Sequence, residues 1–310
     1  MSETLLNLLE TASIKFTNRE FEQSSNLYKK ALFELLIENH KLYMATQDLE
    51  GAEISAKQLL TLDRNLFEGY QRYFQILIVM SKFNIAEQVI AKAEENAIDI
   101  NELKNIVDIA FDKILIELSK ATENSSHFDN ALSLLDDLNS KSGLSPEIKE
   151  AISFSKIEIY IKQENYHEAL DLLSKFTPVN GDDERPNYLK LTCYAGLDDY
   201  DNTIKYATKV EKGKTDFFIY FAKYSKAFVS YKLSRHGLIF PSLAENFYSE
   251  AVMFLKEVCR KTNDVFAYMF LIRLYIENNK QAIAKELINK LPLELQIELD
   301  KYFASYNFEG

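Results

Sequence analysis

The sequence predicts an all-α fold, a solenoid of about eight antiparallel helical hairpins that runs as a single body through residues 1–310. Three observations carry this prediction. A bulky residue followed three positions later by a small one recurs along the whole chain. Glycine and proline are scarce, at 8 and 5 residues, which favours long helices because both weaken a helix interior. Apolar residues make up 47% and charged residues 27%, as in folded globular proteins.

The recurring pattern defines the repeat. Its copies are Phe21 with Ser24, Leu49 with Ala52, Phe83 with Ala86, Phe128 with Ala131, Tyr166 with Ala169, Tyr200 with Thr203 and Tyr248 with Ala251. The last copy ends at Ala284, with Lys280 and Gln281 in place of the aromatic. Successive small residues are separated by 28, 34, 45, 38, 34, 48 and 33 positions. A period near this length indicates stacked helical hairpins, because one hairpin cannot bury its apolar face alone.

At this point the chain resembles the tetratricopeptide repeat (TPR) family, whose repeat is about 34 residues long. The best copy matches the family pattern at Tyr268, Leu271, Tyr275, Ala284, Ile288 and Leu291. Repeat three matches it at Tyr70, Tyr73, Phe74, Phe83, Ala86, Ile90 and Ala93, and repeat five at Tyr160, Tyr166, Ala169, Leu173 and Phe176. The family's tryptophan is absent. The resemblance implies a right-handed superhelix.

Three stretches depart from the regular period. Residues 20–46 contain no glycine or proline and belong to the shortest separation, so we expect one long helix or two with a tight joint. Residues 177–187 are rich in Pro, Gly, Asn and Asp, which predicts either a hinge or an ordinary turn between repeats. Residues 234–243, with Gly237 and Pro241, form an insertion after a strongly aromatic helix.

Charge and cysteine content narrow the classes of partner. A net charge of −11 and a pI near 5.1 argue against nucleic acid, which requires clustered Lys and Arg, and favour a neutral or basic protein. The longest apolar run, residues 76–80, is far below the roughly 20 residues of a membrane span, so no membrane partner is expected. Cys193 and Cys259 predict no disulfide framework. Together with an N-terminus that does not look like a secretory signal, they favour a cytoplasmic location.

No pattern of catalytic or metal-binding residues is found in the sequence. His40, His127, His167 and His236 lack metal-ligand spacing to one another or to cysteine. A phosphate-binding glycine loop, a nucleophile elbow and a Cys/His pair with an orienting residue are also missing. We therefore expect no enzyme activity and no cofactor.

The resemblance also implies a binding groove. In TPR proteins the first helix of each hairpin lines a concave face that binds extended peptides or partner helices. The corresponding positions here are Gln71, Arg72 and Gln75; Phe154 and Glu158; Arg185, Tyr188 and Thr192; and Met269, Phe270 and Arg273. Tyr and Arg are favoured interface anchors, but an aromatic at helical spacing also fits a core position, so both interpretations remain open.

The lysine and asparagine clamp that some TPR domains use for a C-terminal carboxylate is replaced here by Phe154, Glu158 and Leu189, so recognition of such a terminus is not expected. The sequence thus predicts a protein-interaction scaffold or adaptor that binds a peptide or partner protein in its groove. The alternative is a ligand-responsive regulator whose curvature changes when a peptide or small molecule binds. RNA binding is disfavoured because the groove positions supply no basic stripe.

Overall fold

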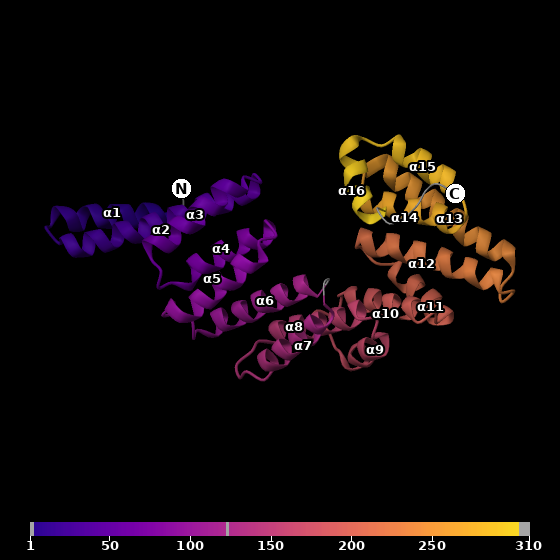
Figure 1. Ribbon diagram of the computed structural model, residues 1–310, viewed down its shortest axis with the longest axis horizontal. Helices are drawn as coiled ribbons and strands as arrows, with labels where there is room; N and C mark the ends of the chain where they lie inside the picture. Colours follow the sequence, from indigo (N-terminus) through magenta and orange to yellow (C-terminus); the bar gives the residue numbers. More distant parts are fainter. Residues whose placement is uncertain (1–2, 122–123, 304–310) are drawn as a thin grey trace. The chain divides into compact units, whose positions relative to one another are not determined.

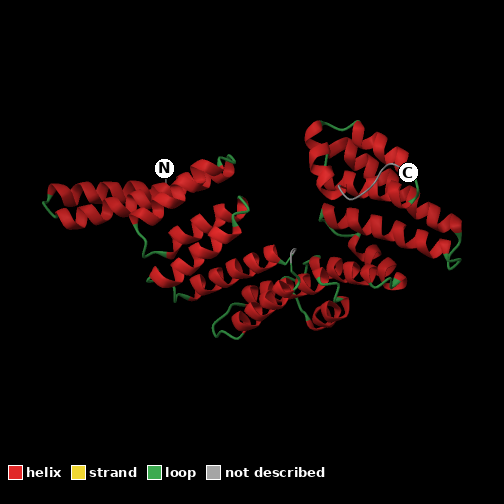
Figure 2. Ribbon diagram, in the orientation of Figure 1, coloured by secondary structure: helices red, strands yellow, loops and turns green. Residues whose placement is uncertain are grey.

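The computed structural model describes residues 3–121 and 124–303, and in this part of the chain it contains 16 helices and no strand (Figures 1 and 2). The all-α helical-repeat class predicted from the sequence is therefore confirmed. The chain divides into two compact units, Met1–Leu144 (unit 1) and Ser145–Gly310 (unit 2). That both units belong to one continuous solenoid, and the hand of its superhelix, stay predictions.

Unit 1 contains seven helices, which are α1 (Glu3–Thr17), α2 (Phe21–Ala45), α3 (Leu49–Leu62), α4 (Phe67–Val79), α5 (Phe83–Asn96), α6 (Leu103–Lys120) and α7 (Ser126–Asn139). Unit 2 contains nine, which are α8 (Pro146–Lys162), α9 (Tyr166–Lys175), α10 (Arg185–Gly196), α11 (Tyr200–Val210), α12 (Asp216–Arg235), α13 (Pro241–Thr262), α14 (Val265–Glu277), α15 (Gln281–Asn289) and α16 (Leu293–Phe303).

The stretch 20–46 forms one uninterrupted helix, α2, which is one of the two alternatives predicted from the sequence. Its first half packs on α1, where the hydroxyl of Ser24 donates to the carbonyl oxygen of Ala12 at 2.8 Å. Its second half packs on α3, where Nδ1 of His40 lies 3.1 Å from the carbonyl oxygen of Ala52. Helix α2 thus ends one hairpin and begins the next, so α1–α15 make eight hairpins.

The small residue of every repeat is buried. All eight are at most 2% exposed, and all lie on the second helix of their hairpin: Ser24, Ala52, Ala86, Ala131, Ala169, Thr203, Ala251 and Ala284. A small side chain there lets the two helices of a hairpin approach closely. The bulky partner is the first residue of its helix in five copies, Phe21, Leu49, Phe83, Tyr166 and Tyr200.

Most of the hairpin turns share one backbone conformation, a residue with positive φ. In six of them a residue other than glycine adopts a positive φ just after the first helix: Arg19, Gln47, Ser81, Glu164, Asp198 and Asn279. At Glu164 (φ 60) its own N–H donates to the carbonyl of Ile161, and the next N–H donates to that of Tyr160. This is the Schellman arrangement, which satisfies the last carbonyls of a helix and usually employs glycine.

Replacing Glu164 with Gly is therefore expected to stabilise the protein by roughly 0.5–1 kcal/mol, because glycine carries no Cβ penalty at positive φ. The matched control is Gln163→Gly one residue earlier, at φ −80, where the added chain entropy should cost a similar amount. Thermal unfolding followed by circular dichroism measures both. Equal signs for the two substitutions would refute the account of the turn.

The hairpin α12–α13 carries the insertion predicted at 234–243. Helix α12 ends at Arg235 and α13 begins at Pro241, seven residues before the repeat's Tyr248, so both helices extend the hairpin at its turn. In the segment 177–187, residues 177–184 lie in the connection from α9 to α10, and residues 185–187 form the first turn of α10. There the N–H of Val179 donates to the carboxylate of Glu150 at 2.8 Å. Whether this connection acts as a hinge stays a prediction.

Candidate binding surfaces

In unit 2 the first helices of the hairpins pack in order, α8 on α10, α10 on α12 and α12 on α14 (Figure 1). Aromatic rings connect the last three. The ring of Tyr188 on α10 stacks on that of Phe218, with centroids 4.3 Å apart and planes at 13°. It also meets Phe217 and Phe221 edge to face at 5.9 and 5.3 Å. Such pairs add about 0.5–1.5 kcal/mol each beyond their buried area.

The chain of rings continues to α14 and α16. Phe217 lies 5.0 Å from Phe266, and Phe266 lies 6.4 Å from Tyr302. Phe266 is 36% exposed and Tyr302 41% exposed, while the rings on α10 and α12 are half-buried. We call this set the aromatic face: Tyr188, Phe217, Phe221, Tyr224, Phe266 and Tyr302.

Three residues assigned to the groove from the sequence are core residues instead. Phe154, Met269 and Phe270 are 4%, 6% and 2% exposed. Phe270 lies beneath the aromatic face, 5.8 Å from Phe221 and 5.3 Å from Tyr224, and Phe154 packs on Phe176 at 4.7 Å. A partner cannot reach side chains so deeply covered, so we remove them from the candidate site.

The other predicted positions of unit 2 remain accessible in part. Arg185 pairs with Asp183 at 2.7 Å and lies over the ring of Phe154, 4.1 Å from its centroid; the ion pair raises the pKa of Arg185. The hydroxyl of Thr192 donates to the carbonyl of Tyr188 at 3.1 Å. Burial raises the pKa of Tyr188, so its phenol stays a neutral donor. Only Tyr188 of these belongs to the aromatic face.

Glu158 and Arg273 complete the predicted set in unit 2. Glu158 is exposed on α8. Arg273 follows Phe270 by three positions on α14, which places both on one side of the helix. Its Nε is buried and has no hydrogen-bond partner among the described residues. Their roles in binding stay predictions.

Most of the aromatic face escaped the sequence-based assignment. The sequence does mark residues 217–231 as aromatic on several sides, but that pattern alone cannot tell which rings face a neighbouring helix. Phe266 and Tyr302 could not be assigned from the sequence, because buried aromatics stand beside them, Tyr268 and Phe270 on α14 and Phe303 on α16, and only the packing of the two helices decides which rings are exposed.

In unit 1 the predicted residues on α4 contact residues of their own unit. The amide of Gln71 donates to Asp108 on α6 at 2.9 Å. Arg72 pairs with Glu68 at 2.6 Å and reaches Gln75, which is itself exposed. Gln71 therefore helps to hold α4 and α6 together, whereas the contacts of Arg72 with Glu68 and Gln75 lie within α4.

An unusual carboxyl lies one turn beyond Asp108. Oδ2 of Asp112 is buried and has no hydrogen-bond partner in the described part of the chain. Burial, and secondarily the neighbouring charge of Asp108, raise the pKa of Asp112 to about 7. The carboxyl is therefore partly protonated near neutral pH.

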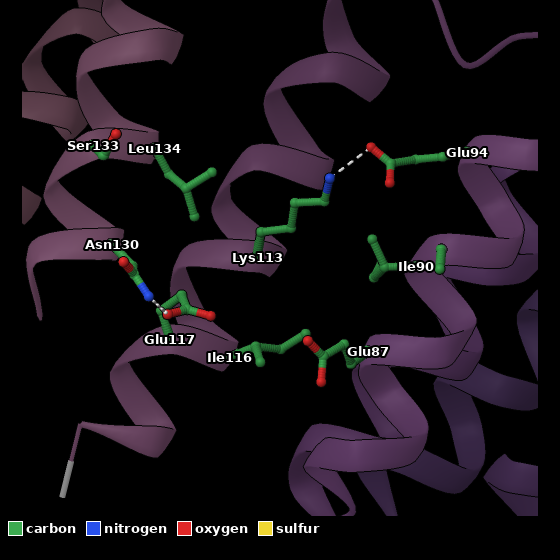
Figure 3. Close-up of a pocket in the computed structure, with 10 residues that line it drawn as sticks. Glu87, Ile90, Glu94, Lys113, Ile116, Glu117, Asn130, Ser133 and Leu134 are labelled. Atoms are coloured by element: carbon green, nitrogen blue, oxygen red, sulfur yellow. Dashed lines mark hydrogen bonds and ion pairs between the residues drawn. The ribbon is translucent and has the colours of Figure 1, made fainter. Parts of the chain in front are cut away.

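A pocket of about 490 Å³ opens between α5, α6 and α7 (Figure 3). Apolar side chains lining it include Ile90, Ile116 and Leu134. At one side, Lys113 pairs with Glu94 at 2.6 Å.

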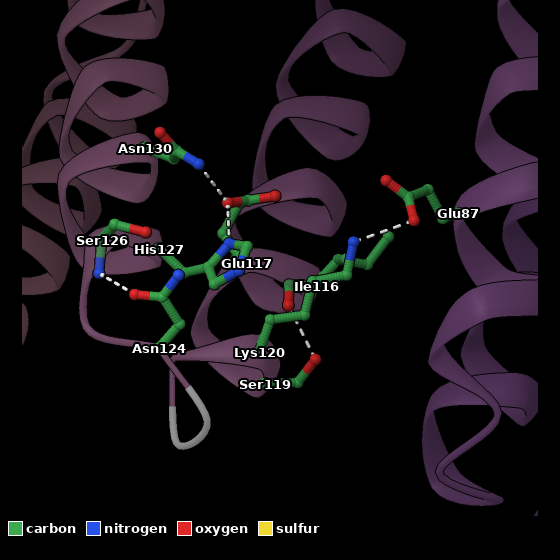
Figure 4. A network of polar contacts seen from close by, with 9 residues as sticks. All are labelled: Glu87, Ile116, Glu117, Ser119, Lys120, Asn124, Ser126, His127 and Asn130. Carbon is green, nitrogen blue, oxygen red and sulfur yellow. Dashed lines mark hydrogen bonds and ion pairs between the residues drawn. The ribbon is translucent and has the colours of Figure 1, made fainter.

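Further along α6, the polar groups at the pocket contact one another rather than point to a ligand (Figure 4). Lys120 pairs with Glu87 at 2.8 Å. Glu117 accepts from Asn130 and lies 2.8 Å from Nδ1 of His127. This pairing gives His127 a structural role.

Across 3–121 and 124–303, no group of three or more His, Cys, Asp or Glu side chains is placed to hold a metal ion. Cys193 and Cys259 are free and buried, and burial raises the pKa of each thiol to about 12, which makes both unreactive. No helix in these ranges is both long and apolar enough to cross a membrane.

Comparison with known proteins shows which solved structures have a similar fold. No protein-family model matches the chain. No curated protein sequence matches it either. A tetratricopeptide repeat protein from Parabacteroides merdae is similar in structure, with a TM-score of 0.56 and 16% identity, over 87% of this chain and 98% of that one.

A signal-transduction ATPase with a tetratricopeptide repeat sensor, from Pyrococcus horikoshii, is similar with a TM-score of 0.60 and 16% identity, over 98% of this chain. The chain spans 50% of the length of that ATPase. At such identities the likeness shows the fold alone. The chain has a TPR-like helical-repeat fold, which confirms the resemblance drawn from its sequence.

Proposed function

We propose that this chain is a scaffold that binds a segment of another protein on the aromatic face of unit 2, without catalysis. The observation that carries the proposal is the continuity of six partly accessible rings across α10, α12, α14 and α16. Rigid aromatic rings offer large contact area at low entropic cost, and Tyr is enriched among residues that dominate binding energy.

The chemistry of the face indicates what it would bind. Phe217, Phe221 and Phe266 present hydrocarbon, whereas Tyr188 and Tyr224 add hydroxyl groups. An extended peptide or an amphipathic helix with apolar anchors fits such a surface. We infer a neutral or basic partner from the net charge of −11, and neither nucleic acid nor a membrane. The inferred cytoplasmic location is supported by two buried free thiols.

The proposal predicts that Tyr188→Ala combined with Phe266→Ala abolishes capture of the partner from a lysate of the native cell. The matched control is Tyr206→Ala, which removes a ring that is stacked on Tyr194 at 5.3 Å and does not belong to the aromatic face. Bound proteins are compared by quantitative mass spectrometry, and circular dichroism checks folding. Truncating two central anchors should lower binding at least about 30-fold, while the control stays near wild type.

An unchanged set of bound proteins in the double variant, with its fold intact, would rule out the aromatic face as the site.

The alternative, a regulator whose curvature changes on binding, is tested by a different measurement. Small-angle scattering of the chain with its captured partner would show changed dimensions if binding altered the curvature, as nearest-neighbour contacts between repeats permit.

A further inference from the structure

Arg273 on α14 is a cation without a partner in the described part of the chain. It makes no ion pair, hydrogen bond or cation–π contact there, and its Nε is buried. Burying an unpaired donor costs free energy, and a charged donor costs more than a neutral one. The other two arginines predicted for the groove are paired, Arg72 with Glu68 at 2.6 Å and Arg185 with Asp183 at 2.7 Å.

The pattern of burial along α14 shows where Arg273 lies. From Phe266 to Tyr275, every residue is buried except Phe266 and Arg273. These two are seven residues apart, which is close to two turns, so they lie within about 20° of each other around the helix axis. Phe266 belongs to the aromatic face. Arg273 therefore lies on the same open side of α14, about 10 Å further along the helix.

The surroundings of Arg273 on this side of α14 are mostly hydrocarbon. Phe270 lies between Phe266 and Arg273 in the helical row, and its ring is covered by those of α12, with Tyr224 at 5.3 Å. The acid of α14 is Glu277, one turn beyond Arg273, and no ion pair joins the two in the described chain. A ligand that lies between Phe266 and Arg273 is thus on the side of the cation away from Glu277.

We propose that Arg273 binds a carboxylate of the partner, so that the segment docked on the aromatic face carries an Asp or Glu side chain about 10 Å from an apolar side chain packed on Phe266. This inference rests on the proposed function and names the chemistry that its site selects. The guanidinium presents a planar fork of N–H donors that suits a carboxylate, and such charge-assisted hydrogen bonds are strong. A partner that is neutral or basic overall can carry one such acid.

The distance between Phe266 and Arg273 predicts a spacing in the partner sequence. An extended peptide advances about 3.3 Å per residue, so about 10 Å corresponds to three residues. A helix advances about 1.5 Å per residue, so the same distance corresponds to seven. The acid should therefore stand three or seven positions from the apolar anchor.

Peptide selection tests the inference although the partner is unidentified. A library of random dodecapeptides displayed on phage is selected against the immobilised full chain. Peptides enriched on the wild type should contain Asp or Glu three or seven positions from a large apolar residue. Selection on Arg273→Gln should lose the acid and keep the apolar residue, because this variant leaves the rings in place. The Tyr188→Ala, Phe266→Ala double variant should enrich neither.

Affinities of one enriched peptide measure the size of the effect. The peptide carries fluorescein, and fluorescence anisotropy compares it with a version in which the corresponding amide residue replaces its acid. The wild type should bind the acidic peptide about 10–100-fold more tightly than the amide version. Arg273→Gln should bind both alike, and Arg273→Lys should keep part of the preference. The matched control, Arg260→Gln, removes an exposed arginine from α13 and should behave like the wild type.

Failure of this inference and failure of the proposed function give different results. Enriched peptides without an acid, or a preference for the acid that survives in Arg273→Gln, would overturn the role of Arg273 and leave the proposed function intact. Equal loss of affinity for the acidic and the amide peptide in a folded Arg273→Gln would also overturn it, because the residue would then act through packing. No enrichment, or peptides that bind the Tyr188→Ala, Phe266→Ala double variant as tightly as the wild type, would contradict both proposals.

Discussion

Replacing Asp112 with Asn is expected to raise the free energy of unfolding at pH 8 by about 2–3 kcal/mol. The carboxyl is mostly buried and its Oδ2 is unpartnered within the described chain, so folding must either desolvate a charge or take up a proton. The difference between a pKa of 3.8 and one of about 7 corresponds to about 4 kcal/mol, an upper limit because the group keeps some contact with solvent.

The pH dependence follows from the sign of the shift. Between about pH 4 and pH 7 the folded protein holds a proton on Asp112 that the unfolded chain has lost. The free energy of unfolding therefore falls as the pH rises through this window, and the penalty is complete above pH 7. Burial lowers the pKa of His40, which gives the free energy of unfolding the opposite pH dependence. The unfolded chain protonates this imidazole below about pH 6.5 while the folded protein keeps it neutral, so the free energy of unfolding falls as the pH drops through and below 6.5.

Urea unfolding of wild type and Asp112→Asn at pH 5, 6, 7 and 8 separates the two groups, because His40 contributes equally to both proteins. The difference between them should grow with pH and level off above 7. A difference that is constant with pH would show that the carboxyl ionises normally in the folded state.

Phe270→Ala is expected to cost about 3–5 kcal/mol of stability. Its ring is 2% exposed and lies within 6 Å of Phe217, Phe221 and Tyr224, so its removal leaves a cavity beneath the aromatic face. Urea unfolding followed by circular dichroism measures the loss.

Phe266→Ala provides the comparison on the same helix. Phe266 is 36% exposed and should cost about 1 kcal/mol or less, while weakening capture of the partner. Phe270→Leu should recover much of the stability lost in Phe270→Ala, because it refills the cavity in part. If Phe266→Ala cost as much as Phe270→Ala, the division into core and binding face would be wrong.

The repeat was predictable from the sequence because it rests on small residues with one role. Ala86, Ala169 and Thr203 recur at the same position of the second helix of their hairpins, and all three are buried as their spacing indicates. The long helix α2 was predictable only in part: the absence of a helix-breaking residue allowed one helix or two with a tight joint, and the structure shows one.

The aromatic face proposed for binding was less predictable, because the exposure of its rings depends on which side of a helix its neighbours cover. Phe270 and Phe266 are both aromatic and lie four positions apart on α14, yet one is core and the other is accessible. Asp112 is a second example. In the sequence it is an ordinary acid on a helix, and its raised pKa arises only when burial removes water from it.

Photo-cross-linking tests the proposed binding face most directly. Benzoylphenylalanine is placed either at Phe266, on the aromatic face, or at Met253, which is 68% exposed on α13. The partner captured by the wild type should form a covalent adduct from position 266 and none from position 253. An adduct from position 253 alone, or equal adducts from both, would contradict the aromatic face as the binding site.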